Sequence, residues 1–279
     1  MEYVKLHNGL TMPIFGIGTY LLTPDEAENS VTAALECGYR LIDTANMYAN
    51  EKAVGRAMRS SGVPRGEIFL ETKIWPTHYT AEDAIDRTLE RLGTDYIDLL
   101  LIHQPTGDYI SGYRMLEKAY REGKVRAIGL SNFTQQEMCR MMNICSIKPA
   151  VLQTELHPYY SEQELKKFLN LQDIRIQAWY PLGHGDSKLI NESIFTRLAK
   201  KYGKTNAQII RRWHVQAGYI GIPGAKSPGH ISDNIDFFDF ELTENEMLNI
   251  GALDRGERYY KRSPERFERY LSMKIPFED

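Results

Sequence analysis

The sequence contains few cysteines and no excess of basic residues, and each shortage excludes a class of protein. Three cysteines occur in 279 residues, and their spacing fits neither a CxxC pair nor another metal-ligand pattern. An odd number of cysteines without a regular framework is typical of a reducing compartment. The net charge is -3, whereas nucleic-acid-binding proteins usually carry a basic stripe. We therefore expect no disulfide scaffold, no metal site and no nucleic-acid partner.

Long apolar runs, linkers and a targeting signal are also missing. No stretch approaches the roughly 20 apolar residues needed to cross a bilayer. The first residues, MEYVKLHNGL, lack the basic and apolar regions of a signal peptide. No Ser/Gly-rich or low-complexity segment divides the chain. The sequence therefore predicts one domain over residues 1–279, located in the cytoplasm and without a membrane partner.

The chain does contain a regular series of short apolar runs, and these predict its strands. Most of them lack strict alternation, and near-continuous apolar runs are typical of strands that are covered on both faces of a parallel sheet. The eight runs cover residues 12–18, 39–45, 68–74, 97–103, 125–132, 151–157, 174–180 and 219–224.

Helical patterns with clear start signals separate these runs. Capping boxes, in which Ser or Thr is followed three residues later by Glu, are expected at Thr23, Thr134 and Ser161. Alternating strands and helices place the chain in the α/β class, and eight such units predict a single closed (β/α)8 TIM barrel. The alternative, an open doubly wound sheet, usually has a G-x-G-x-x-G loop after its first strand. Gly16 and Gly18 lack a third glycine in register, so we interpret them as flexible backbone at a strand end.

Polar residues stand where several of these runs stop, and barrels of this class carry their chemistry at the carboxyl ends of the strands. Asp43, Lys73 and His103 each end a run, and Tyr48 follows Asp43 closely. A lysine ammonium favours the phenolate form of a nearby tyrosine and lowers its pKa, and a carboxylate holds the lysine in place. Asp43, Lys73 and Tyr48 could therefore form a tuned proton donor. A neutral His103 could orient a carbonyl oxygen.

Motifs for other kinds of chemistry are missing. The sequence has no G-x-S-x-G nucleophile motif and no HExxH or paired-histidine spacing for zinc. Acid catalysis without a nucleophile or a metal fits the reduction of a carbonyl group by a hydride that a cofactor supplies.

Seven segments in this order resemble those of the aldo-keto reductases. They are LIDTANMYANE, ETKIW, LLIHQP, IGLSNF, LQTELHP, AWYPLGHG and IPGAKSPGHISDN. Asp43, Tyr48, Lys73 and His103 stand at the four catalytic positions of that family. The resemblance implies NAD(P)H-dependent reduction of a small aldehyde or ketone, usually by a monomeric barrel.

The resemblance also implies the residues that bind the cofactor and the substrate. Ser131, Asn132 and Gln153 should hold the carboxamide, and Trp179 should stack on the nicotinamide. The other expected cofactor contacts are Gly18, Thr19, Pro181, Leu182, Gly183, Gly224, Ala225, Lys226, Ser227, His230, Asp233 and Asn234. The expected substrate pocket contains Tyr20, Met47 and Trp75.

The cofactor loop departs from the common family pattern. Gly224 stands at the usual lysine position, Ala225 at the serine, and His230 at the arginine near the adenosine 2′-phosphate. Lys226 and Ser227 could partly compensate for these losses. We therefore expect a relaxed coenzyme preference, with NADPH/NADP+ bound and NADH/NAD+ also usable.

Several alternatives remain open at this point. The pair of Asp43 and Lys73 could be a structural ion pair, and Ser131 with Asn132 could simply cap the next helix. The tail, residues 255–279, could be a surface helix or could cover the substrate mouth. The whole protein could be a non-catalytic, nicotinamide-binding regulatory subunit.

Overall fold

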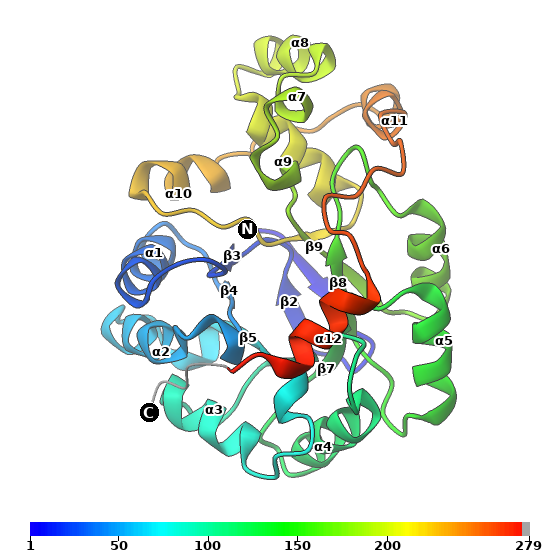
Figure 1. The fold of residues 1–279 in the computed structure, drawn as a ribbon. Helices are drawn as coiled ribbons and strands as arrows, with labels where there is room; N and C mark the ends of the chain where they lie inside the picture. Colours follow the sequence, from blue (N-terminus) through cyan, green and yellow to red (C-terminus); the bar gives the residue numbers. More distant parts are fainter. Residues whose placement is uncertain (275–279) are drawn as a thin grey trace.

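Eight parallel strands form a curled sheet that closes into a barrel with helices around it (Figure 1). The computed structural model describes residues 1–274. Parallel bridges join Phe15 to Gly221 and Gly18 to Gly224, so the first and last strands meet. In sequence order, which is also the order in the sheet, the strands are β3 (Ile17–Gly18), β4 (Leu41–Asp43), β5 (Phe69–Ile74), β6 (Leu99–Ile102), β7 (Ile128–Ser131), β8 (Val151–Glu155), β9 (Arg175–Trp179) and β10 (Ile220–Gly221). The predicted barrel fold is confirmed.

Helices connect the strands and cover the outside of the barrel, as Figure 1 shows. The α-helices are α1 (Pro24–Glu36), α2 (Glu51–Ser60), α3 (Ala84–Leu92), α4 (Tyr109–Arg121), α5 (Gln135–Ile144), α6 (Gln163–Leu171), α7 (Ser187–Ile190), α8 (Ser193–Tyr202), α9 (Asn206–Gln216), α10 (Pro228–Ile235), α11 (Glu244–Gly251) and α12 (Pro264–Ser272). The short 3-10 helices are η1 (Asn46–Tyr48), η2 (Arg65–Glu67), η3 (Pro76–His78) and η4 (Gly183–Gly185). Among the residues described, no helix combines the length and the apolar character needed to cross a membrane.

The sequence had suggested that the first apolar run, residues 12–18, forms one strand, and this was wrong. Its beginning belongs to β2 (Thr11–Pro13), which pairs antiparallel with β1 (Tyr3–Lys5), and only its end forms β3 of the barrel. The role assigned to its glycines was wrong at Gly16. A Cβ atom there would lie 2.4 Å from Leu41 Cγ, so close packing between neighbouring strands, rather than flexibility, requires glycine.

Two of the three predicted capping boxes are confirmed. The side chains of Thr23 and Thr134 each accept a hydrogen bond from the backbone N–H three residues on. The glutamate at that position accepts a hydrogen bond from the backbone N–H of the threonine. The capping box at Ser161 was wrong: α6 is preceded by Glu162 in a left-handed conformation, and no side chain caps it. The Ser161 hydroxyl instead donates to the Asp254 carboxylate, which a distant part of the chain supplies.

The strands bury both of their faces, because one side fills the barrel and the other packs under the helices. All six residues of β5 are buried, including Glu71 and Lys73. Successive side chains of a strand point to opposite faces, so these two charged residues share one side of β5. This side meets Gln153 of β8 and Gln177 of β9 across the barrel.

Candidate active site

The strand ends bring three of the expected residues into direct contact. The Lys73 ammonium donates to Asp43 Oδ1 at 2.5 Å, to the carbonyl oxygen of Thr44 at 2.9 Å and to Tyr48 Oη at 3.4 Å. These contacts use all three N–H groups of the ammonium. Asp43 ends β4, Lys73 lies near the end of β5, and Tyr48 ends η1 in the loop between them. One lysine therefore links a carboxylate to a phenol.

The phenol of Tyr48 holds its proton at neutral pH. Burial around the hydroxyl, and next the charge of Asp43, raise the pKa of Tyr48 well above its ordinary value. The sequence had suggested that Lys73 would lower this pKa, but desolvation and the Asp43 carboxylate raise it instead. A protonated phenol in this position can act as a proton donor.

His103, directly after β6, supplies a neutral donor beside this phenol. Its ring centroid lies 5.7 Å from that of Tyr48 and 4.9 Å from that of Trp75. Burial, and next the charge of Lys73, lower the pKa of His103 well below its ordinary value. Its buried Nδ1 has no hydrogen-bond partner within residues 1–274. A neutral imidazole keeps one N–H that can point at an oxygen atom.

Ser131 and Asn132 belong to a chain of side-chain hydrogen bonds at the ends of β7 and β9. Trp179 Nε1 donates to Asn132 Oδ1 at 3.1 Å. Asn132 Nδ2 donates in turn to the carbonyl oxygen of His103 at 3.1 Å and to Ser131 Oγ at 3.1 Å. The alternative that these two residues cap α5 is wrong, because Thr134 is the cap.

Gln153 faces the interior of the barrel beneath Lys73. Its Nε2 lies 2.9 Å from Asp43 Oδ1, 2.7 Å from Glu71 Oε1 and 3.0 Å from Gln177 Oε1. Sequence reasoning missed Glu71 and Gln177. The signal that could have found them is a polar residue in the middle of an otherwise apolar run, at the second position before a strand-end residue.

An aromatic cluster built from distant segments adjoins these groups. Trp75 donates from Nε1 to the carbonyl oxygen of Tyr270 in α12 at 3.1 Å, and the two rings meet edge to face at 4.8 Å. Met47 packs against the same cluster. The ring of Tyr20, which is 45% exposed, lies 5.1 Å from that of Tyr48. Tyr20 thus lies beside Tyr48 and Trp75 beside His103, and Met47 packs against the cluster of Trp75 and Tyr270.

Helix α12 brings the tail to this cluster. Figure 1 shows it crossing in front of the barrel. The tail is anchored by Glu155, a buried residue at the end of β8, whose carboxylate accepts the backbone N–H groups of Tyr259 at 2.6 Å and Tyr260 at 3.0 Å. The last five residues of the 255–279 tail lie outside the described residues.

The expected cofactor loop leads from β10 into α10. Gly224 and His230 are exposed, and Ser227 caps α10 through its side chain. Lys226 does not occupy the position left open by Gly224, because its ammonium pairs with Glu26 Oε1 at 3.0 Å.

The remaining expected cofactor contacts lie in the neighbouring loops. Asp233 is exposed and Asn234 is buried, both in α10. Thr19 donates to the carbonyl oxygen of Asp43 at 3.0 Å. Pro181, Leu182 and Gly183 follow β9. These residues follow β3, β9 and β10 in the chain, and Trp179 at the end of β9 is half-buried.

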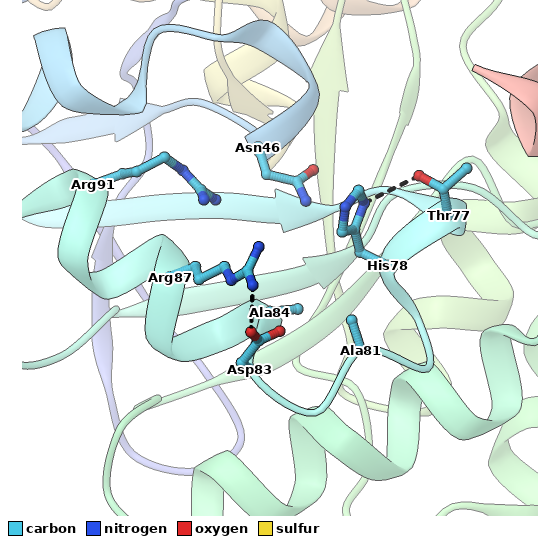
Figure 2. Close-up of a pocket in the computed structure, with 8 residues that line it drawn as sticks. All are labelled: Asn46, Thr77, His78, Ala81, Asp83, Ala84, Arg87 and Arg91. Atoms are coloured by element: carbon cyan, nitrogen blue, oxygen red, sulfur yellow. Dashed lines mark hydrogen bonds and ion pairs between the residues drawn. The ribbon is translucent and has the colours of Figure 1, made fainter. Parts of the chain in front are cut away.

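A cavity of about 270 Å³ lies beside this site rather than in it. Figure 2 shows its lining side chains, which come from η1, η3, α3 and the loop between η3 and α3. The charged groups that line it are paired, since Arg87 binds Asp83 at 2.7 Å and Arg91 binds Glu51 at 2.7 Å. The cavity adjoins the site through Asn46, whose Oδ1 accepts the backbone N–H of Trp75. Within the described part of the chain, no group of three or more His, Cys, Asp or Glu side chains could hold a metal ion.

The chain matches known proteins over most of its length. The model of the Aldo/keto reductase family matches residues 14–255. A glyoxal reductase from Bacillus subtilis is 43% identical over 262 residues, which cover 92% of this chain and 94% of the relative. The methylglyoxal reductase DkgA of Yersinia pestis is 38% identical over 259 residues, 91% of this chain and 94% of that one. A solved aldo/keto reductase from Brucella melitensis superposes with a TM-score of 0.87 at 40% identity, covering 91% of this chain and 99% of that chain.

Proposed function

Because the chain belongs to the aldo/keto reductase family and is an oxidoreductase that acts on carbonyl compounds, we propose that it reduces a small aldehyde or ketone through Tyr48, Lys73, Asp43 and His103. The observation that carries these roles is the position of the Lys73 ammonium, 2.5 Å from Asp43 and 3.4 Å from Tyr48. A nicotinamide cofactor, when bound, would supply the hydride for the carbonyl carbon. Tyr48 gives its proton to the carbonyl oxygen, which completes the alcohol.

The other residues position and polarise the carbonyl group. A neutral His103 donates its N–H to the carbonyl oxygen and so stabilises the negative charge that develops there. Lys73 stabilises the phenolate that remains when Tyr48 has lost its proton, and Asp43 holds the ammonium in place. Solvent then returns a proton to Tyr48 after the product leaves.

The cofactor site that we propose combines the expected residues with the observed contacts. Ser131, Asn132 and Gln153 hold the carboxamide of the nicotinamide. Since Gln153 directs its Nε2 into the barrel, its carbonyl oxygen is the atom that would accept from the amide. Trp179 stacks on the ring.

At the other end of the nucleotide, Gly224 stands at the usual lysine position and offers no charge. His230 stands where the family pattern has an arginine. Lys226 is held by Glu26. A 2′-phosphate is usually captured by Arg or Lys side chains, so both NADPH and NADH should bind.

The names of two relatives support a small substrate. Glyoxal and methylglyoxal, which name two similar reductases, are the first candidates for this chain, and α12 limits the space beside Trp75. We further propose that the protein is cytoplasmic, which its three free thiols support. We also propose that it is a monomer, as the resemblance to the family implies.

The test is a panel of aldehydes and ketones, each assayed with NADPH and with NADH. In Tyr48→Phe, kcat should fall by about 10²–10⁴-fold, whereas the cofactor dissociation constant, measured by fluorescence, should change little. Tyr113→Phe is the matched control, because it removes a buried phenol that bonds Ile147 in another part of the fold. A Tyr48→Phe variant with wild-type kcat would exclude the phenol as proton donor. Cofactor binding without any carbonyl reduction would favour a regulatory subunit.

A further inference from the structure

Beneath the proposed catalytic groups lies a second carboxyl that the reaction does not use. Glu71 is 0% exposed, Lys73 is 0% exposed and Asp43 is 2% exposed. Glu71 and Lys73 stand two residues apart on β5 and therefore point to the same side of the strand. The cluster of Asp43, Glu71 and Lys73 thus contains two carboxyl groups but one ammonium.

The charge of this cluster is unbalanced if every group is ionised. Asp43 and Glu71 would carry two negative charges and Lys73 one positive charge. An uncompensated charge in a buried site has a large desolvation cost, and proteins usually avoid it by leaving the group neutral. Asp43 has the ammonium at 2.5 Å, so Glu71 is the carboxyl without a cation in contact.

The hydrogen bonds of the cluster indicate the same conclusion independently. The amide group of Gln153 has two hydrogens, but its Nε2 lies within 3.0 Å of three oxygens, on Asp43, Glu71 and Gln177. Gln177 Nε2 donates separately to Glu71 Oε2 at 2.7 Å. The two hydrogens of the Gln153 amide can serve only two of these three oxygens, and its nitrogen is not an acceptor. The remaining oxygen needs a hydrogen from another group, and a protonated Glu71 supplies one when it donates to Asp43.

The electrostatics agree with this count. Burial, and next the charge of Asp43, raise the pKa of Glu71 well above its ordinary value, and Lys73 opposes them only in part. A hydrogen bond with Asp43 acts in the same direction, and two carboxyl groups can share such a bond only when one carries a proton. An ionised Glu71 would also raise the pKa of Tyr48 further and so weaken it as an acid.

We propose that Glu71 is a neutral carboxylic acid in the folded protein and a positioning residue for Asp43 and Gln153. It holds the Asp43 carboxylate toward Lys73 and fixes the amide of Gln153, and it leaves the ammonium with one counter-charge. The effect on turnover rests on the proposed function, whereas the protonation state of Glu71 does not.

Two substitutions separate the hydrogen bonding of the neutral Glu71 side chain from the space that it fills. Glu71→Gln is neutral, similar in shape and able to donate, so it should retain most of kcat. Glu71→Leu is neutral and similar in size but cannot bond, and its kcat should fall by about tenfold or more while circular dichroism shows a folded protein. If the Gln variant loses as much kcat as the Leu variant, or if neither loses any, the positioning role is wrong.

Infrared difference spectra test the protonation state without any turnover. At neutral pH, the wild type minus Glu71→Gln should show the carbonyl stretch of a protonated carboxylic acid. Glu51→Gln is the matched control, because Glu51 is equally buried but has Arg91 at 2.7 Å, and its difference spectrum should show a carboxylate. A carboxylate signal from Glu71 would overturn the proposal, even if the enzyme proves active.

The pH dependence of stability gives a further readout. The unfolded chain releases the Glu71 proton above pH 4.5, the ordinary value, whereas the folded protein keeps it. The charged groups facing Glu71 are Asp43 of β4 and Lys73 of β5. The wild type should therefore lose stability relative to Glu71→Gln as the pH rises from that value toward the folded-state pKa. A difference between the two urea midpoints that is constant from acid to alkaline pH would show that Glu71 is ionised in the fold.

Discussion

Removing the Lys73 ammonium should damage stability and turnover for different reasons, and the two effects can be separated. Lys73 is in contact with Asp43 at 2.5 Å, and their side chains are 0% and 4% exposed. Lys73→Met keeps most of the side-chain volume but leaves the Asp43 carboxylate buried and unpaired. Breaking a buried pair in this way costs about 3–5 kcal/mol. Since each kcal/mol shifts Tm by roughly 2–4 °C in a protein of comparable size, Tm should fall by roughly 6–20 °C.

The double variant Asp43→Asn/Lys73→Met should recover most of this stability, because no unpaired charge remains in the barrel. Replacement of a whole buried ion pair by neutral groups is often close to neutral. Turnover should not recover, since Tyr48 still lacks the ammonium that stabilises its phenolate. Asp43→Asn alone should lower stability and kcat less than Lys73→Met does. Glu71 lies on the same side of β5 as Lys73 and can ionise in place of the lost carboxylate.

Urea denaturation followed by circular dichroism gives the free energies of unfolding, and NADPH oxidation with a carbonyl substrate gives kcat. The single and double variants form one thermodynamic cycle for each quantity. If the double variant regained kcat together with stability, Lys73 would be only structural. If Lys73→Met stayed within about 1 kcal/mol of the wild type, the pair would be much better solvated than its burial indicates.

Three further predictions concern the cofactor and the tail. Trp179→Ala should weaken cofactor binding by about 2–10-fold, the equivalent of ~0.5–1.5 kcal/mol of stacking; an unchanged dissociation constant would exclude stacking. The dissociation constants of NADPH and NADH should be similar, because Gly224 offers no charge and Glu26 holds the Lys226 ammonium at 3.0 Å; a several-hundredfold NADPH preference would mean that a cation occupies the phosphate site. Burial would raise the pKa of Glu155, but hydrogen bonds from His157 and from the N–H groups of Tyr259 and Tyr260 outweigh it and hold the pKa below its ordinary value, so the anchor of the tail should be present above pH 4.5 and lost as the pH falls through the folded-state pKa. Glu155→Gln should make the tail more sensitive to protease at neutral pH than the wild type, and equal cleavage would show that the anchor contributes nothing.

The sequence by itself determined the barrel and the position of the proposed catalytic groups. Apolar runs that recur at regular intervals with capped helices between them can close only into a few architectures. The residues at the ends of these runs then face one mouth, because the carboxyl ends of parallel strands lie together. The contact between Asp43 and Lys73 follows from this rule, since they end neighbouring strands. Local signals were also sufficient to predict the start of some helices, as the capping box at Thr134 did for α5.

The tertiary structure alone decided which buried polar groups form hydrogen bonds with one another. Glu71 meets Gln153 and Gln177 across separations of 82 and 106 residues, and no periodicity in the sequence records which side chains meet in the interior of a barrel. The same holds for Ser161. Its hydroxyl donates to the distant Asp254 carboxylate and does not cap α6 as expected. The pKa of Tyr48 also depends on this environment. The sequence places a lysine beside the phenol, but the desolvation and the Asp43 charge that raise its pKa arise only when the folded barrel surrounds the phenol.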